Sequence, residues 1–494
     1  MPLLDECGWS VLRALVVALT AGLLSACVRE LALVGGGRSR RWLLALLVTP
    51  FVTPVLLVGY AYSNTALALV RHPGWKELLY VGLLTMRLVP VCVLVLAFAP
   101  APVSPEAVFC HRLVTRTRRG WRGLASRLAF ALHGPARTWA VASGLVFLLA
   151  FSETEMAALL YIQSWTVSVF DAQTGGLALG ESLRFGALPF LIEAALLILL
   201  MALLFRAVSA EGGTWVECRG SRGKRRSGVS HALRGGALAY LVVAVIVVTL
   251  VPAGIVLRSV GIGLATVLRT PVLWQDIAVS IMVAATAVVL ALVGTRPLLP
   301  RDAMRLSGQR FACLCAVALP GLLGTLLLGL VALALFQCPG LHVLSATPVP
   351  LLLGLCLALL PFALVLEVLR RVSEPAAALH AAELLTAAAP ETVRAHGRRL
   401  VFELRGRAGL WLVCFLFIMA YFDLTLAAML APPGATCVSV RLYNLMHYGQ
   451  TPVLSAMVAM ALAAALATLL LAGIVWPWAA GWRPSGRAAV EHGK

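Results

Sequence analysis

Apolar residues are grouped along this chain in long uninterrupted runs, and the stretches between the runs are polar, basic or rich in Gly and Pro. Each run has roughly 20 residues, which is long enough to cross a bilayer as an α-helix. We therefore predict an all-α integral membrane protein with about eleven transmembrane helices. The predicted spans are 10–34, 42–62, 77–99, 136–156, 187–207, 236–258, 275–295, 312–336, 349–369, 407–430 and 453–477.

The composition agrees with lipid as the solvent of this chain. Of its 494 residues, 61% are hydrophobic and 12% are charged, and the mean hydropathy is +0.94. Soluble proteins carry about twice that share of charge. The net charge of +19 does not indicate nucleic-acid binding, because the basic residues lie between the apolar runs.

Lysine and arginine also predict the orientation. About 32 of the 40 lie in or beside every second segment that connects two spans, and about seven lie in the segments on the opposite side of the membrane. Loops rich in Lys and Arg stay in the cytoplasm, so the N-terminus is expected outside and the C-terminus inside. The inside segments are 35–41, 100–135, 208–235, 296–311, 370–406 and the tail.

The spacing of the cysteines and the absence of known enzyme motifs limit the functions that the sequence supports. The eleven cysteines form no C-x-x-C pair, and we predict no metal site and no cofactor. Cys338 and Cys437 both fall in expected outside loops, where a disulfide is an open alternative. Cys27 ends a lipobox-like tetrapeptide, which we interpret as a chance match within the first helix. No phosphate-binding G-x-x-x-x-G-K-[ST] and no hydrolase motif occurs, so we predict no catalytic residue and an external energy source.

The two halves resemble each other at an offset of about 270 residues. Residues 150–160 align with 420–430, so that Glu153 faces Asp423, and five spans of each half superpose. Six spans separate matching helices, which predicts parallel rather than inverted repeats, with 236–258 as the additional helix. The predicted units are a first half 1–208, a basic linker 209–235, a second half 236–480 and a tail 481–494.

Each half carries a long inside loop between the same two helices, at 100–135 and 370–406, with Arg among Ala and Leu at helical spacing. Ser104 followed by Pro105 is a typical helix start. Two amphipathic inside helices predict two equivalent docking points for a two-fold symmetric partner. The alternative is a pair of basic surface loops.

These loops carry a resemblance to a family. Glu106-Ala107 in one loop and His380-Ala381-Ala382-Glu383 in the other resemble the EAA loop of permease subunits of bacterial binding-protein-dependent ABC importers. The segment 421–449, with its acidic residue, its Leu-Ala-Pro-Pro and its Arg-Leu-Tyr, is similar to a second segment of that family. The resemblance is to the fused two-half form known from ferric-iron and thiamine permeases.

The resemblance implies a type I permease fold of five plus six helices in a bacterial cytoplasmic membrane. It also implies a pair of separate ABC ATPase subunits seated inside on the two loops, and a solute-binding protein outside at 157–186 and 431–452. Ferric iron is the leading substrate it suggests, followed by thiamine or another small solute. Departures from the motif, such as Arg112 and Thr386 where the family has Gly, leave the register of the coupling contacts open.

Three carboxylates are candidates for the translocation path: Glu153, Glu155 and Asp423. Acidic side chains are costly in a bilayer and usually face a bundle interior or a water path. One interpretation is that they interact with a cationic substrate at the outer mouth. The other is that they pair with backbone or arginine groups and hold a helix-to-loop turn. A secondary transporter built from two parallel repeats, which needs no ATPase, is the alternative function.

Overall fold

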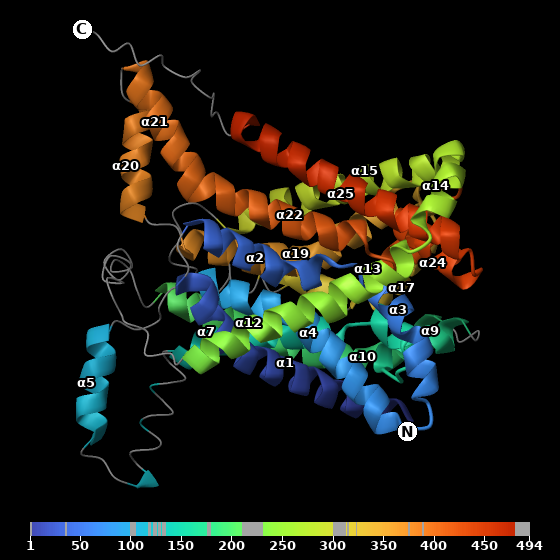
Figure 1. The fold of residues 1–494 in the computed structure, drawn as a ribbon, viewed down its shortest axis with the longest axis horizontal. Helices are drawn as coiled ribbons and strands as arrows, with labels where there is room; N and C mark the ends of the chain where they lie inside the picture. The colour runs from blue at the N-terminus through green and yellow to red at the C-terminus, as the bar shows by residue number, and fades with distance from the viewer. Residues whose placement is uncertain are drawn as a thin grey trace.

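A bundle of long helices with roughly parallel axes makes up the computed structural model of the chain (Figure 1). It describes residues 2–34, 37–98, 105–116, 135–174, 179–209, 231–299, 316–322, 324–373, 376–387 and 390–479, with residues 120, 121, 126, 130 and 313. Within these residues every regular element is helical. The expectation of an all-α fold is therefore confirmed for the described residues.

The helices follow the chain in two series. The first series is α1 (Pro2–Val34), α2 (Gly37–Val52), α3 (Val55–Ala68), α4 (Pro73–Phe98), α5 (Pro105–Arg116), α7 (Pro135–Phe151), α8 (Glu155–Leu159), α9 (Trp165–Thr174) and α10 (Leu179–Ser209). A connecting helix comes next, formed by α12 (His231–Val245), the π-helical turn η1 (Ile246–Leu250) and α13 (Val251–Leu257).

The second series begins after this connecting helix. It consists of α14 (Val260–Arg269), α15 (Pro271–Leu298), η2 (Leu319–Leu322), α17 (Gly324–Gln337), α18 (His342–Ser345), α19 (Val349–Ser373), α20 (Ala376–Ala387), α21 (Glu391–Val401), the π-helical turn η3 (Phe402–Gly406), α22 (Arg407–Tyr421), α23 (Thr425–Leu430), α24 (Val438–His447) and α25 (Thr451–Ala479).

Seven of the described helices are long and apolar enough to cross a membrane. An eighth candidate is the pair α2 and α3, which meet at a 71° bend. Pro54 lies at this bend; it has no backbone N–H to donate and restricts the residue before it. The expected spans 136–156, 312–336 and 407–430 coincide instead with the shorter helices α7, α17 and α22, so the count of eleven stays a prediction.

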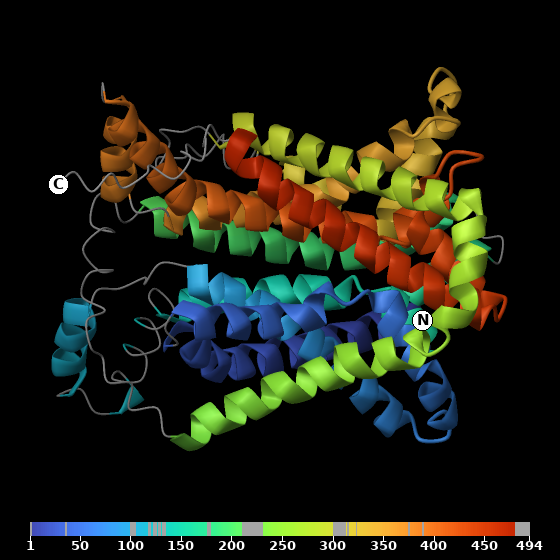
Figure 2. The same ribbon diagram turned by 45° about the horizontal axis from the view of Figure 1, so that its top comes forward.

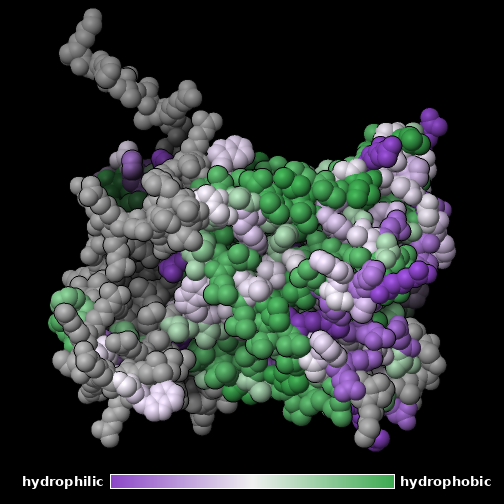
Figure 3. All heavy atoms as spheres, turned by 60° about the horizontal axis from the view of Figure 1, so that its bottom comes forward, coloured by the Kyte–Doolittle hydropathy of each residue, from purple (hydrophilic) through white to green (hydrophobic). Residues whose placement is uncertain are grey.

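The surface fits a lipid environment. Apolar residues cover the middle of the face in Figure 3, and hydrophilic residues gather at its right-hand end. Large apolar side chains such as Leu23 and Leu470 are 74% and 69% exposed. Exposed apolar surface of this extent indicates contact with lipid or with a partner.

Hydrogen bonds between distant residues recur at equivalent places in the two series. The hydroxyl of Ser10 accepts from the backbone N–H of Trp165 at 3.3 Å, and the hydroxyl of Ser280 accepts from that of Val438 at 2.7 Å. The helix pairs α7–α8 and α22–α23 likewise repeat a helix, a sharp turn and a short second helix. The likeness of the halves thus extends to individual side-chain contacts.

The two series are interlocked rather than side by side. Helix α10, the last of the first series, packs against η2 and α17 of the second as well as against α7. The connecting helix packs in turn against α1, α2 and α3, and α13 also contacts α25 (Figure 2). Helices from each half therefore pack directly against helices of the other half.

Helices α5, α20 and α21 project from one end of the bundle, and α9, α24 and the start of α1 lie at the other (Figure 1). Helix α5 begins at Pro105, as the Ser-Pro pair predicts, and Ser104 itself lies outside the described residues. The described helices of the two loops expected inside thus lie beyond the same end of the bundle.

Candidate functional site

Glu153 and Asp423 occupy the same position in the two helix–turn–helix units. Glu153 follows α7, and its Oε1 accepts a hydrogen bond of 2.9 Å from the backbone N–H of Met156 in α8. Asp423 follows α22, and its Oδ1 accepts one of 2.8 Å from Leu426 in α23. The first N–H groups of a helix have no partner inside it, so each carboxylate stabilises the start of a short helix.

Glu155 has a different role. Its Oε1 accepts a hydrogen bond of 2.9 Å from the backbone N–H of Leu424, in the corresponding turn of the other half. This contact is not mirrored, because Thr425 stands at the equivalent position of the second half. Glu155 therefore links the two turns directly.

Arg87, a cation inside a predicted membrane span, lies beside this pair of turns. Its Nη1 is 3.7 Å from Oε2 of Glu153, and its guanidinium carbon is 5.7 Å from the ring centre of Phe51. The sequence offered no partner for Arg87, because α4 and the turn after α7 are far apart along the chain. Of the two interpretations of the carboxylates, Glu153 therefore fits the second, because it contacts a backbone N–H group and an arginine.

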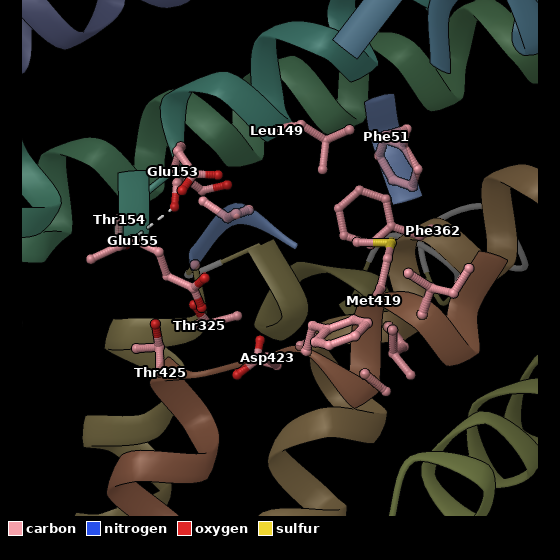
Figure 4. Close-up of a pocket in the computed structure, with 18 of the residues that line it drawn as sticks. Phe51, Leu149, Glu153, Thr154, Glu155, Thr325, Phe362, Met419, Asp423 and Thr425 are labelled. Atoms are coloured by element: carbon pink, nitrogen blue, oxygen red, sulfur yellow. Dashed lines mark hydrogen bonds between the residues drawn. The ribbon is translucent and has the colours of Figure 1, made fainter. Parts of the chain in front are cut away.

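The same side chains line a cavity of about 180 Å³ (Figure 4). Its polar side is formed by residues from both halves: Arg87, Ser152, Glu153, Thr154, Glu155, Glu193, Thr325, Asp423 and Thr425. Its apolar side includes Phe51, Leu149, Phe362, Met419 and Phe422. The cavity is therefore amphipathic, with carboxylates and hydroxyls opposite aromatic and aliphatic groups.

Aromatic packing between the halves adjoins the apolar side. The rings of Phe51 and Phe415 are stacked, with centroids 4.9 Å apart and planes 4° from parallel. Phe51 lies in the last turn of α2, just before the bend between α2 and α3. Thr53, which lies in that bend, shares a hydrogen bond of 2.8 Å with Thr249 of η1. The connecting helix thus contacts the segment that carries Phe51.

Glu193 was not among the site residues predicted from the sequence. It lies in α10, is 1% exposed and lines the cavity. Neither of its carboxyl oxygens has a hydrogen-bond partner in the described part of the chain. Glu367, another acid within a long apolar helix, is instead held by Arg370 and Arg371 at 2.6 and 2.8 Å.

The candidate coupling residues lie far from this cavity. Glu106 and Ala107 lie in the first turn of α5, and their side chains are outside the described residues. On α20, His380, Ala381 and Glu383 are exposed, and Ala382 is 1% exposed.

Helix α20 packs against α21 as a hairpin. A Cβ added at Gly397 of α21 would be 2.6 Å from the backbone nitrogen of Thr386. Because that distance is shorter than van der Waals contact, the close pairing of the two helices requires glycine here.

The segments expected outside carry two cysteines and a histidine. Cys338 and Cys437 are both free thiols, so the alternative of a disulfide between them is wrong in this structure. His447 stacks on Tyr443 with ring centroids 5.8 Å apart, which is ordinary aromatic packing within one helix. Among the described residues, no group of three or more His, Cys, Asp or Glu side chains is arranged to hold a metal ion.

The chain was compared with protein-family models, with curated proteins and with solved structures, and none of the three comparisons finds a match.

Proposed function

We propose that this chain is the permease of a binding-protein-dependent ABC importer. In this proposal the halves are parallel repeats about a pseudo-dyad, and the solute crosses between them. The observation that supports it most is that one acidic turn from each half lines a single cavity, with Glu155 linking the turns. Intramembrane acids of this kind usually mark a transport path.

The position of the α20–α21 hairpin supports coupling to a separate ATPase. The chain runs as one helical path from Glu391 through α21, η3 and α22 to Tyr421, two residues before Asp423. A force on the hairpin would therefore be transmitted to the turn that lines the cavity. Leu384 on α20 is 61% exposed at the end from which the hairpin projects, and an exposed apolar side chain there suits a protein partner.

The resemblance supplies the rest of the proposal. The membrane is a bacterial cytoplasmic one, with the N-terminus outside and the hairpins inside. The solute-binding protein docks at the end that holds α9 and α24. Ferric iron is the leading cargo, followed by thiamine or another small solute, and ATP is hydrolysed on the partner subunits.

Detergent extraction and affinity purification from native membranes test the coupling. We expect ATPase activity to co-elute with the chain, and Leu384→Glu to abolish it by placing a charge in the apolar contact. The matched control is Val343→Glu. Val343 is 80% exposed on α18, at the opposite end of α19 from α20. Co-elution that is absent, or equally strong in both variants, contradicts the importer.

The secondary transporter remains the second candidate because of one observation. A buried carboxylate without a partner, as at Glu193, is typical of residues that carry protons in transporters. Uptake that persists after ATP depletion and stops with a protonophore would favour this candidate.

A further inference from the structure

The carboxylate of Glu193 is buried in a place where nothing described in the protein compensates it. Both oxygens lack a hydrogen-bond partner, and the residue is 1% exposed. Burial of an acid without partners is unfavourable. Glu193 also lines the cavity, so a rotation of its buried side chain toward a group that enters the cavity would supply the missing contacts.

Acidic side chains outnumber basic ones in the lining of the cavity. Four carboxylates, Glu153, Glu155, Glu193 and Asp423, share the cavity with the guanidinium of Arg87. Arg87 pairs with Glu153 at 3.7 Å. Glu155 and Asp423 each accept one backbone N–H, which leaves acceptor capacity on both. The electrostatic complement of the cavity is therefore a cation.

The arrangement of the acidic and aromatic side chains in the lining indicates which kind of cation fits the cavity. The described acidic side chains are not grouped as ligands of a single metal ion. The opposite side of the cavity presents the rings of Phe51, Phe362 and Phe422, which suit an apolar body and attract cations through their faces. A cavity of about 150 Å³ is enough for benzene, so about 180 Å³ accommodates a body of that size.

We propose that the cavity is a binding site for a compact organic cation that has N–H donors and an apolar body, and that Glu193 binds its charged group. This inference rests on the proposed function, because it names the class of solute that uses the path. It departs from the ferric iron that the resemblance suggests and assigns selectivity to the permease itself, since a bare metal ion or an anion would lack matching contacts here.

Benzamidinium is a suitable probe, because it joins a planar N–H cation to a benzene ring. We expect isothermal titration to detect its binding to the full-length chain in lipid nanodiscs, and no binding of the neutral analogue benzamide. Glu193→Gln keeps the shape and removes the charge. It should weaken binding about tenfold or more, the size expected for one charge-assisted hydrogen bond.

Glu181→Gln is the matched control, because Glu181 lies exposed on the same helix. It should leave the affinity unchanged. Equal binding of benzamide and benzamidinium by the unmodified protein would overturn the inference, and this comparison needs no variant to fold. Equal affinity of Glu193→Gln and the unmodified chain, or binding of ferric ion in place of benzamidinium, would also overturn it.

Failure of this inference is distinguishable from failure of the importer proposal. Binding to the isolated chain needs neither ATPase nor binding protein. A chain that binds benzamidinium but never co-elutes with ATPase activity would contradict the importer alone. One that co-elutes with an ATPase but does not bind benzamidinium would contradict the organic cation alone.

Discussion

Removal of the charge on Arg87 should be the most informative single perturbation of the cavity. Nη1 of Arg87 and Oε2 of Glu153 are 3.7 Å apart, and the two side chains are only 15% and 12% exposed. Coulomb's law at an effective dielectric constant of about 20 gives an attraction of about 4.5 kcal/mol at this distance. Loss of one partner of a buried pair typically costs about 3–5 kcal/mol, because the other charge is left uncompensated.

The assay is a double-mutant cycle of Arg87→Met, Glu153→Gln and the double variant, with unfolding followed in bicelles. We expect each single variant to lose about 3 kcal/mol of unfolding free energy or more, and the double variant to lose less than the sum of the two. The loss in Arg87→Met should be the larger, because Glu155 and Asp423 line the same cavity as Arg87 and would also lose its positive charge.

The exposed pair Arg399 and Glu403 provides the control. These side chains are 3.2 Å apart and are 63% and 45% exposed, so water screens them. Their coupling energy should be about 0.3–0.5 kcal/mol, as for other exposed helical pairs. Additivity of the Arg87 and Glu153 variants within about 0.5 kcal/mol would refute the reasoning, since it would mean that the buried charges do not interact.

Three further substitutions test the packing and caps around the site. Asp423→Ala should destabilise the protein by about 0.5–2 kcal/mol in thermal unfolding, because the cap of α23 is lost. Asp423→Asn should keep most of the stability, because its side-chain oxygen can accept the same hydrogen bond. Gly263→Ala should cost about 1–3 kcal/mol or prevent folding, since its Cβ would overlap the backbone carbonyl oxygen of Pro452 in α25, whereas Gly261→Ala meets nothing within 4 Å. Tyr62→Phe should cost about 1 kcal/mol by losing a 2.8 Å hydrogen bond to a carbonyl of η1.

Each of these three has an outcome that would contradict it. A stable Asp423→Ala variant would mean that the turn after α22 does not need its cap. Equal melting temperatures for the two glycine variants would mean that α14 and α25 are not in close contact. An unchanged Tyr62→Phe variant would mean that the connecting helix is not anchored to α3 by this bond.

The close likeness of the two turns could be anticipated, because it depends on local sequence. The alignment of Glu153 with Asp423 needs only residue identities, and both acids do stabilise the start of a short helix. The cavity residue Glu193 could not be selected in this way. An acid in an apolar run gives no sign of which helix it faces, and Glu367, an acid of the same kind, is held by neighbouring arginines.

The amino-acid sequence alone indicated an all-α membrane protein, the approximate positions of most of its long apolar helices, and an acidic turn that occurs twice. These properties depend on hydropathy and on contacts between near neighbours, so they can be inferred from the order of residues along the chain. Only the tertiary structure decided that Arg87 pairs with Glu153, that Glu155 links the two halves, and that Glu193 shares their cavity. Such contacts join residues distant in the chain, and they depend on how the helices rotate and interlock.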